Sequence, residues 1–186
     1  MVLLAPCASS RPKFTQTDLA PRPHESVNDE GEGGHHGAAF VQDMNSMNIR
    51  TATPEDITAM HVIRLRVREN RLSDPSVVTE QDYHDFMARD TMSWVAELQG
   101  IMFGFTMVDV EKQNLWALFV APEHEFKGIG KALHEKMILS YFKQADRLRL
   151  TTAPRTRAAA FYRAAGYEEK GPTSTGKELI FELRKH

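Results

Sequence analysis

The sequence predicts one α/β domain over residues 47–186, built on a mixed central sheet with helices on both of its faces. Three observations predict this fold class. Runs with strand-like and helix-like apolar spacing alternate from residue 47 to residue 183. An apolar run at 115–120 leads through two glycines into an amphipathic helix pattern. The chain has 186 residues, which is enough for one domain with a sizeable core.

The strands are predicted by short runs of alternating or continuous apolar residues. They are expected at 48–52, 93–98, 101–108, 115–120, 147–152, 167–169 and 178–183. Gln99 and Gly100 form a turn between two of them, and the short polar stretch 109–113 makes a hairpin. With the helices, the element order is β-α-α-β-β-β-α-β-α-β-β.

The helices are predicted by apolar residues that recur every three or four positions. Thr53 before Pro54, and Thr79 before an acidic turn, predict helix starts, and Gly166 stands where a glycine ends a helix. Helices are expected from 53 to about 68, from 79 onward, after the glycines at 128 and 130, and from 156 to 165. Residues 70–75 are expected to form a loop.

Residues 1–46 are predicted to lie outside the domain as a disordered tail. They hold Pro, Gly, Ser and a His-Gly cluster, without sustained periodicity. Such a composition cannot bury enough apolar surface to offset the entropy of ordering. Because Met44 and Met47 directly precede the first strand, an alternative hypothesis is that residues 1–43 are an artefact of the assigned start. A peptide from residues 1–40 in mass spectrometry of the native protein would refute that hypothesis.

Charge and cysteine content narrow the class of protein. The net charge is −2, and the tail holds three basic and six acidic residues, which leaves the domain at +1. This balance does not favour nucleic acid as a partner. Cys7 is the single cysteine, so no disulfide can form within the chain, which fits a reducing compartment. No apolar run reaches membrane-spanning length. We therefore expect a cytoplasmic protein without a nucleic-acid or membrane partner.

The most informative segment is the turn at 125–130, Glu-Phe-Lys-Gly-Ile-Gly, which opens a helix. A helix start presents unpaired backbone N–H groups and the positive end of the helix dipole, so it favours an anion such as phosphate. The spacing matches neither G-x-x-x-x-G-K-[ST] nor G-x-G-x-x-G. On their own, two glycines near a helix start are as typical of a plain tight turn.

This segment resembles motif A of the GNAT acyltransferase superfamily, Q/R-x-x-G-x-G/A, with Glu125 at the first position. Residues 161–167, Phe-Tyr-Arg-Ala-Ala-Gly-Tyr, resemble the late signature F-Y-x-x-x-G-F of that family. The two motifs stand in the family's order and at about its spacing, and the resemblance covers about 47–185. It implies the GNAT fold and an acetyl-coenzyme A-dependent N-acetyltransferase acting on a small-molecule amine or on an amine of a peptide or protein. It leaves a homodimer open, and no metal site is expected.

The resemblance also implies residue roles. Loop amides would hold the pyrophosphate of acetyl-coenzyme A, and the carboxylate of Glu125 should turn away from it. The strands at 115–120 and 147–152 should splay apart to admit the pantetheine arm. An N–H near Leu118 or Phe119 would bond the thioester carbonyl, and Tyr162 would protonate the leaving thiolate. The implied cofactor-binding residues are Leu118, Phe119, Val120, Phe126, Lys127, Gly128, Ile129, Gly130, Lys131 and Ala132.

Several readings stay open at this level. Tyr162 could be a core tyrosine, and Lys127 and Lys131 could be a solvated helix end. Trp116 could line the acceptor pocket or pack in the core, and Arg155 or Arg157 could reach a phosphate or an anionic acceptor. The general base is either a water chain or one of Glu97, Glu111, Asp82, Asp85, His84 and His61. The alternative function is a non-catalytic coenzyme A-binding module, and a longer acyl donor is also open.

Overall fold

The computed structural model describes residues 47–69 and 74–185, so the expected tail and most of the loop at 70–75 lie outside the described residues. The strands are β1 Asn48–Thr51, β2 Thr91–Leu98, β3 Ile101–Asp109, β4 Asn114–Val120, β5 Arg147–Thr152, β6 Glu168–Pro172 and β7 Leu179–Arg184. The α-helices are α2 Ile57–Arg66, α3 Glu80–Met87, α4 Ile129–Tyr141 and α5 Arg157–Ala164. The predicted element order is confirmed.

The seven strands form one mixed sheet in the order β1-β2-β3-β4-β5-β7-β6. Strands β1 to β4 are antiparallel neighbours, as are β5, β7 and β6. Only β4 and β5 run parallel to each other. The mixed sheet of the sequence prediction is thus confirmed, and its parallel junction lies in the middle.

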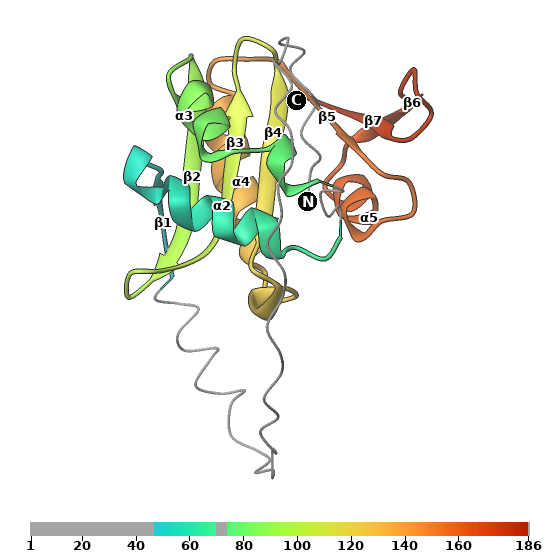
Figure 1. Ribbon diagram of the computed structural model, residues 1–186. Helices are drawn as coiled ribbons and strands as arrows, with labels where there is room; N and C mark the ends of the chain where they lie inside the picture. The colour runs from blue at the N-terminus through green and yellow to red at the C-terminus, as the bar shows by residue number, and fades with distance from the viewer. Residues whose placement is uncertain (1–46, 70–73, 186) are drawn as a thin grey trace, which may run out of the picture. The chain divides into compact units, whose positions relative to one another are not determined.

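Helices cover both faces of the sheet. In Figure 1, α2 and α3 lie in front of strands β2 to β4, whereas α4 lies behind the same strands. Side chains from α2 and α3 form a buried cluster with Phe105, Ala117 and Phe119 of the sheet. From the opposite face, α4 contributes Leu133, Met137 and Tyr141, which are fully buried. The helix α5 lies beside β5, on the far side of the junction from α2 (Figure 1).

Local capping fixes the first two helix starts where the sequence predicted them. The side chain of Thr53 pairs reciprocally with Asp56, and that of Thr79 with Asp82. These capping boxes satisfy the free N–H groups of the first turn. The first helix is preceded by a 3₁₀ turn at Pro54–Asp56 and ends two residues earlier than expected, because the backbone turns extended at Val67.

The remaining differences are shifts of element boundaries. Two short 3₁₀ turns, Pro75–Val77 and Pro122–His124, were not predicted. Tyr167 was expected in a strand, but its N–H donates to the carbonyl of Tyr162 at 3.0 Å, and β6 starts one residue later. Among the helices described, none has both the length and the apolar character needed to cross a bilayer.

Candidate functional site

The two central strands separate soon after they meet. β4 and β5 pair at a single position, Asn114 with Arg149, and the N–H of Arg149 donates to the carbonyl of Gln113 at 2.8 Å. The register between β3 and β4 shifts so that Trp116 has no partner on β3. Such a bulge bends and twists its strand. After this bulge, the second half of β4 forms no ladder with β5 in the described structure, so its edge on that side is open.

The backbone of β4 alternates between its neighbour β3 and this open edge. The N–H of Ala121 donates to the carbonyl of Phe103 at 2.8 Å, and Phe119 lies opposite Phe105. Hydrogen-bonded pairs alternate along an antiparallel ladder, so Phe119 also directs its backbone groups to β3. The N–H and C=O groups of Leu118 and Val120 therefore face the gap, where a ligand can pair with them as an added strand would.

The start of α4 lies next to this open edge. Gly128 precedes the helix with φ +80, a left-handed conformation that glycine adopts without strain. The next three amides, at residues 129–131, have no acceptor within the helix because they belong to its first turn. A Cβ on Gly130 would lie 3.5 Å from the side chain of Val120. The helix start and the edge of β4 therefore lie close together around a common space.

That space is a pocket of about 450 Å³ between β4, the start of α4 and the start of α5. Segments far apart in the sequence form its walls. Its lining residues are Glu69, Leu118, Val120, His124, Glu125, Phe126, Gly128, Ile129, Gly130, Lys131, Arg157, Ala158, Ala160 and Phe161.

Seven of the eleven site residues predicted from the sequence line this pocket: Leu118, Val120, Phe126, Gly128, Ile129, Gly130 and Lys131. The other four do not. Phe119 is 1% exposed and packs against Phe105 on the α2 face of the sheet, so neither its side chain nor its backbone faces the gap. Lys127 and Ala132 are half-buried outside the lining. Tyr162 lies behind the pocket wall.

Tyr162 is completely buried on α5. It follows Phe161 directly and Ala158 by one helical turn, and both of those residues line the pocket. Its hydroxyl has no hydrogen-bond partner within the described residues. Burial raises the pKa of this phenol well above its usual value, so the group stays protonated at neutral pH. A buried hydroxyl without a partner is rare, and it is suited to a ligand that supplies one.

An ion-pair cluster at the pocket wall joins three segments. The guanidinium of Arg157 donates to both carboxylate oxygens of Glu125, at 2.8 and 3.1 Å. Its Nε lies 3.4 Å from the carboxylate of Glu69, which also accepts the backbone N–H of Arg157 at 2.7 Å. The carboxylate of Glu125 is therefore turned toward Arg157. Glu69 was not among the site residues predicted from the sequence, which indicated only a loop at 70–75.

Phe126 stands at this cluster in a strained conformation. Its φ is +62, a region that bulky residues rarely occupy, and 88% of the residue is exposed although it lines the pocket. The guanidinium of Arg157 lies 5.0 Å from its ring centroid. Strain of this kind is typical of sites that bind a ligand.

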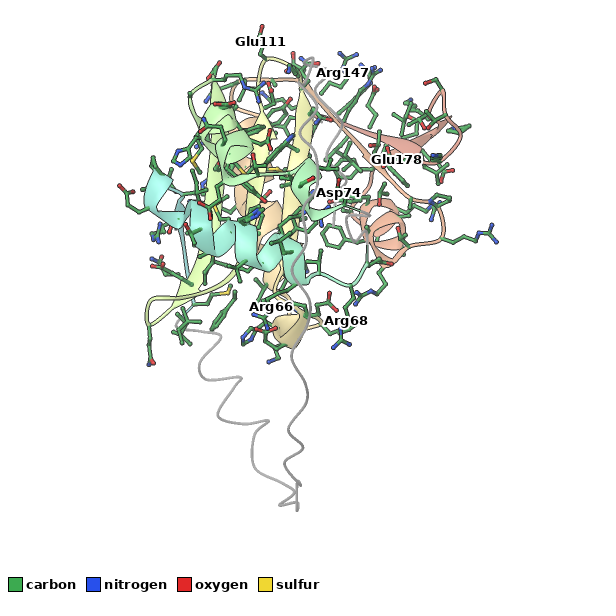
Figure 2. The ribbon with its side chains drawn as sticks, viewed as in Figure 1. Arg66, Arg68, Asp74, Glu111, Arg147 and Glu178 are labelled. Atoms are coloured by element: carbon green, nitrogen blue, oxygen red, sulfur yellow. The ribbon has the colours of Figure 1, made fainter. Side chains whose placement is uncertain are left out.

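The base candidates named from the sequence lie away from the pocket. Glu97 pairs with Arg50 at 2.8 Å on the far edge of the sheet. Figure 2 shows Glu111 at the end of the sheet opposite Arg66 and Arg68, and those two arginines lie at the end where the turn before α4 is found. The other candidates lie on α2 or α3. Asp82 caps α3, and Asp85 accepts a hydrogen bond from Gln81. His84 is exposed, and the ring of His61 packs edge-on to that of Tyr83.

Trp116 and Arg155 both lie outside the pocket lining. Trp116 stacks on Phe86 and contacts Tyr83, which places it in the packing beneath α3 and outside the pocket lining. Arg155 is exposed with φ +59, and it too is absent from the pocket lining. In the described ranges, no group of three His, Cys, Asp or Glu side chains is arranged to hold a metal ion.

Comparisons with known proteins agree with this architecture. The family model described as "Acetyltransferase (GNAT) domain" matches residues 89–169. Similar solved structures include the ribosomal-protein-S18-alanine N-acetyltransferase of Escherichia coli, with TM-score 0.60, 23% identity, 73% of this chain covered and 90% of that one. The PaiA N-acetyltransferase of Thermoplasma acidophilum, in complex with coenzyme A, has a TM-score of 0.65 and 18% identity, with 75% of this chain and 99% of that one covered. YncA of Salmonella typhimurium, with its cofactor acetyl-CoA, has a TM-score of 0.60 and 17% identity, with 75% of this chain and 94% of that one covered.

Proposed function

Because the chain belongs to the GNAT superfamily of acetyltransferases, we propose that it transfers the acetyl group of acetyl-coenzyme A to a primary amine. One observation carries the proposal. The amides at the start of α4 and the open backbone edge of β4 line the same pocket, so one elongated ligand can use both. The first feature suits a pyrophosphate, and the second suits a chain of amides such as pantetheine.

The described residues fit acetyl-coenzyme A, which would supply an acetyl group activated as a thioester. The amides of residues 129–131 would bind the pyrophosphate, whereas that of Ala132 donates within the helix to the carbonyl of Gly128 at 3.0 Å. Lys131 would add a charge-assisted contact from the pocket wall. The backbone groups of Leu118 and Val120 would pair with the pantetheine arm. Phe119 is the least suited of the predicted binding residues, because its backbone pairs with β3. Lys127 and Ala132 lie outside the pocket lining, so they would affect cofactor binding only by supporting the loop and the helix in which they lie.

Acetyl transfer requires stabilisation of charge on the carbonyl oxygen, loss of the amine proton and protonation of the thiolate, and the protein would supply the first and the last. The N–H of Leu118 would donate to the thioester carbonyl as negative charge develops on its oxygen. The amine nitrogen attacks the carbonyl carbon, a C–N bond forms, the C–S bond breaks and the amine proton passes to solvent water. The hydroxyl of Tyr162 would give its proton to the departing thiolate. Its burial behind Ala158 and Phe161, without a partner, supports this role.

The acceptor is a primary amine of a small molecule, a peptide or a protein. The Escherichia coli relative acts on an alanine of a ribosomal protein. At 23% identity that likeness shows the fold alone, so it does not decide between peptide amines and small amines. The acceptor would reach the gap from the face under α2, opposite the face that α4 covers.

Release of free thiol from acetyl-coenzyme A, with a panel of small and peptide amines, tests this function. We expect amine-dependent thiol release, and a roughly 100-fold lower kcat in Tyr162→Phe with KM for acetyl-coenzyme A little changed. Tyr167→Phe is the matched control, since it removes a neighbouring buried hydroxyl that lies outside the pocket lining and is bonded to His134. Binding of coenzyme A without turnover of any amine would instead indicate a non-catalytic binding module.

A further inference from the structure

Arg64 breaks the pattern of the helix that carries it. The inner face of α2 and its extension consists of Ile57, Met60, Ile63 and Val67, all buried. Arg64 lies on that same face and is only 1% exposed. A core-facing position in an amphipathic helix normally holds an apolar residue. Where a sequence departs from a local rule of this kind, a functional reason is the first to examine.

The guanidinium of Arg64 is buried without a counter-charge. None of its three nitrogens has a hydrogen-bond partner in the part of the chain that the structure describes. Its closest described interaction is with the ring of Phe119, whose centroid lies 4.7 Å from its central carbon. Contact with a ring face leaves the in-plane N–H donors unused. Burial lowers the pKa of this group, yet arginine remains charged at neutral pH.

Such a group is costly in the free protein. A buried charge without a counter-charge loses its hydration, and contact with one ring face offsets only part of that loss. Methionine at this position would keep much of the apolar packing without a buried charge. The arrangement is therefore explained if a ligand supplies the missing anion.

The position of Arg64 relative to the gap indicates which ligand that is. Phe119 lies between Leu118 and Val120, the two β4 residues that line the pocket. The side chain of Phe119 belongs to the face covered by α2 and α3. The pocket is lined by β4, the turn before α4, the starts of α4 and α5, and Glu69 beyond the end of α2, and it holds no residue of α2 or α3 themselves. A donor bound in the pocket would fill the gap from the α4 face. The second substrate must then approach from the α2 face, where Arg64 lies.

We propose that Arg64 binds a carboxylate of the acceptor, so that the acceptor is an amine that also carries an acid group. This inference rests on the proposed acetyl transfer. A guanidinium binds a carboxylate through two parallel N–H···O bonds, which fixes orientation as well as affinity. Phe119 and Tyr83 lie near the guanidinium, and both are bulky and buried, which favours a compact anion over a larger one. Free amino acids and peptides with a C-terminal acid close to the amine belong to this class.

Acetyl transfer to matched acids and amides tests the proposal. The probes are L-amino acids and alanine-initiated dipeptides, each as the free acid and as the C-terminal amide, with O-phosphoethanolamine as a phosphate-bearing amine. In the wild-type chain we expect kcat/KM for the best acid to exceed that of its amide at least tenfold. Arg64→Met should reduce this ratio to near one, mainly through KM for the acid, while Kd for coenzyme A stays within about twofold. Arg64→Lys should restore part of the preference.

Arg66→Met is the control, because Arg66 lies on the same helix but is exposed and pairs with Glu123. It should leave the acid preference unchanged. Urea unfolding separates a structural role: Arg64→Met should be at least as stable as the wild type, because no described bond is lost. Equal turnover of acids and amides by the wild type, a preference for the phosphate-bearing amine, or an acid preference that survives in Arg64→Met would each overturn the proposal. If no amine is acetylated at all, the proposed function itself fails and this inference with it.

Discussion

The ion pair between Glu125 and Arg157 predicts opposite effects on cofactor affinity from its two members. Glu125 places a carboxylate in the lining of a pocket suited to phosphates, and Arg157 neutralises it through two hydrogen bonds. Removing Arg157 uncovers a negative charge beside the phosphates. Removing the charge of Glu125 does the reverse, and it also frees the guanidinium for a phosphate. A merely structural salt bridge would predict weakened binding from both changes.

The pocket size sets the magnitude. A sphere with the pocket's volume of about 450 Å³ is about 9 Å across, and two unit charges at that separation interact by about 0.5 kcal/mol in water and about 2 kcal/mol at an effective dielectric constant of 20. The side chain of Arg157 is 43% exposed and that of Glu125 15%, so a value between these limits applies. About 1.4 kcal/mol corresponds to tenfold in Kd.

Isothermal titration with coenzyme A measures the effect. Arg157→Gln should raise Kd roughly tenfold, and Glu125→Gln should lower it roughly threefold to tenfold. The double variant should return to within about threefold of the wild type, because neither the uncovered carboxylate nor the guanidinium remains. These differences should shrink as salt is raised, since the interactions are electrostatic.

Arg163→Gln is the matched control. Arg163 lies on the same helix and pairs with Glu169, and neither residue lines the pocket. The Kd of Arg163→Gln for coenzyme A should stay within about twofold of the wild-type value. The reasoning is refuted if Arg157→Gln binds coenzyme A as the wild type does, or if Glu125→Gln binds it tenfold more weakly.

Three further predictions concern the pH response and the turn. Burial raises the pKa of Tyr162 above its usual 10, so its acid form persists to higher pH. Below about pH 10, kcat should therefore show no decline that is caused by Tyr162. A decline in this range that disappears in Tyr162→Phe would contradict this. Burial lowers the pKa of His134 from 6.5 to about 4, so its neutral form contributes stability above pH 6.5 that is lost as pH falls toward 4, about 3 kcal/mol in urea unfolding. His134→Gln should remove most of that loss; an unchanged pH dependence would show that other groups cause it. Gly128 has φ +80, so Gly128→Ala should cost about 1 kcal/mol of stability and should raise Kd for coenzyme A. Gly100 also has a positive φ but lies in the distant β2–β3 turn, so Gly100→Ala should cost stability alone.

Most elements of the fold could be predicted because their signals are local. The helix starts at Thr53 and Thr79 depend on residues three positions apart, and both capping boxes form. The strand order could not be predicted from such signals, because the pairing of β5 with β7 joins segments about thirty residues apart. Boundaries shifted at Val67, where the backbone turns extended, and at Tyr167, whose N–H donates to the carbonyl of Tyr162; neither change has a residue pattern that marks it in the sequence.

The site was predictable only where it is contiguous. The turn at 125–130 carries its own spacing and lines the pocket. Glu69 was missed because it meets Arg157 across 88 positions of sequence. Phe119 was grouped with Leu118 and Val120 because β4 is apolar on both faces, so its sequence does not show which residues face the gap. The bulge at Trp116, which determines the opening, has no recognisable signal in the sequence.

Titration of ¹⁵N-labelled protein with coenzyme A, followed by amide chemical shifts, tests the central claim most directly. The largest shifts should occur at residues 118, 120 and 126–131 and at the start of α5. A second pocket, at the other end of α4 and lined by Ile138, Phe142 and Leu183, is an internal reference that should stay unchanged. Shifts concentrated at that second pocket, or no saturable shifts at the start of α4, would contradict the assignment of this pocket to acetyl-coenzyme A.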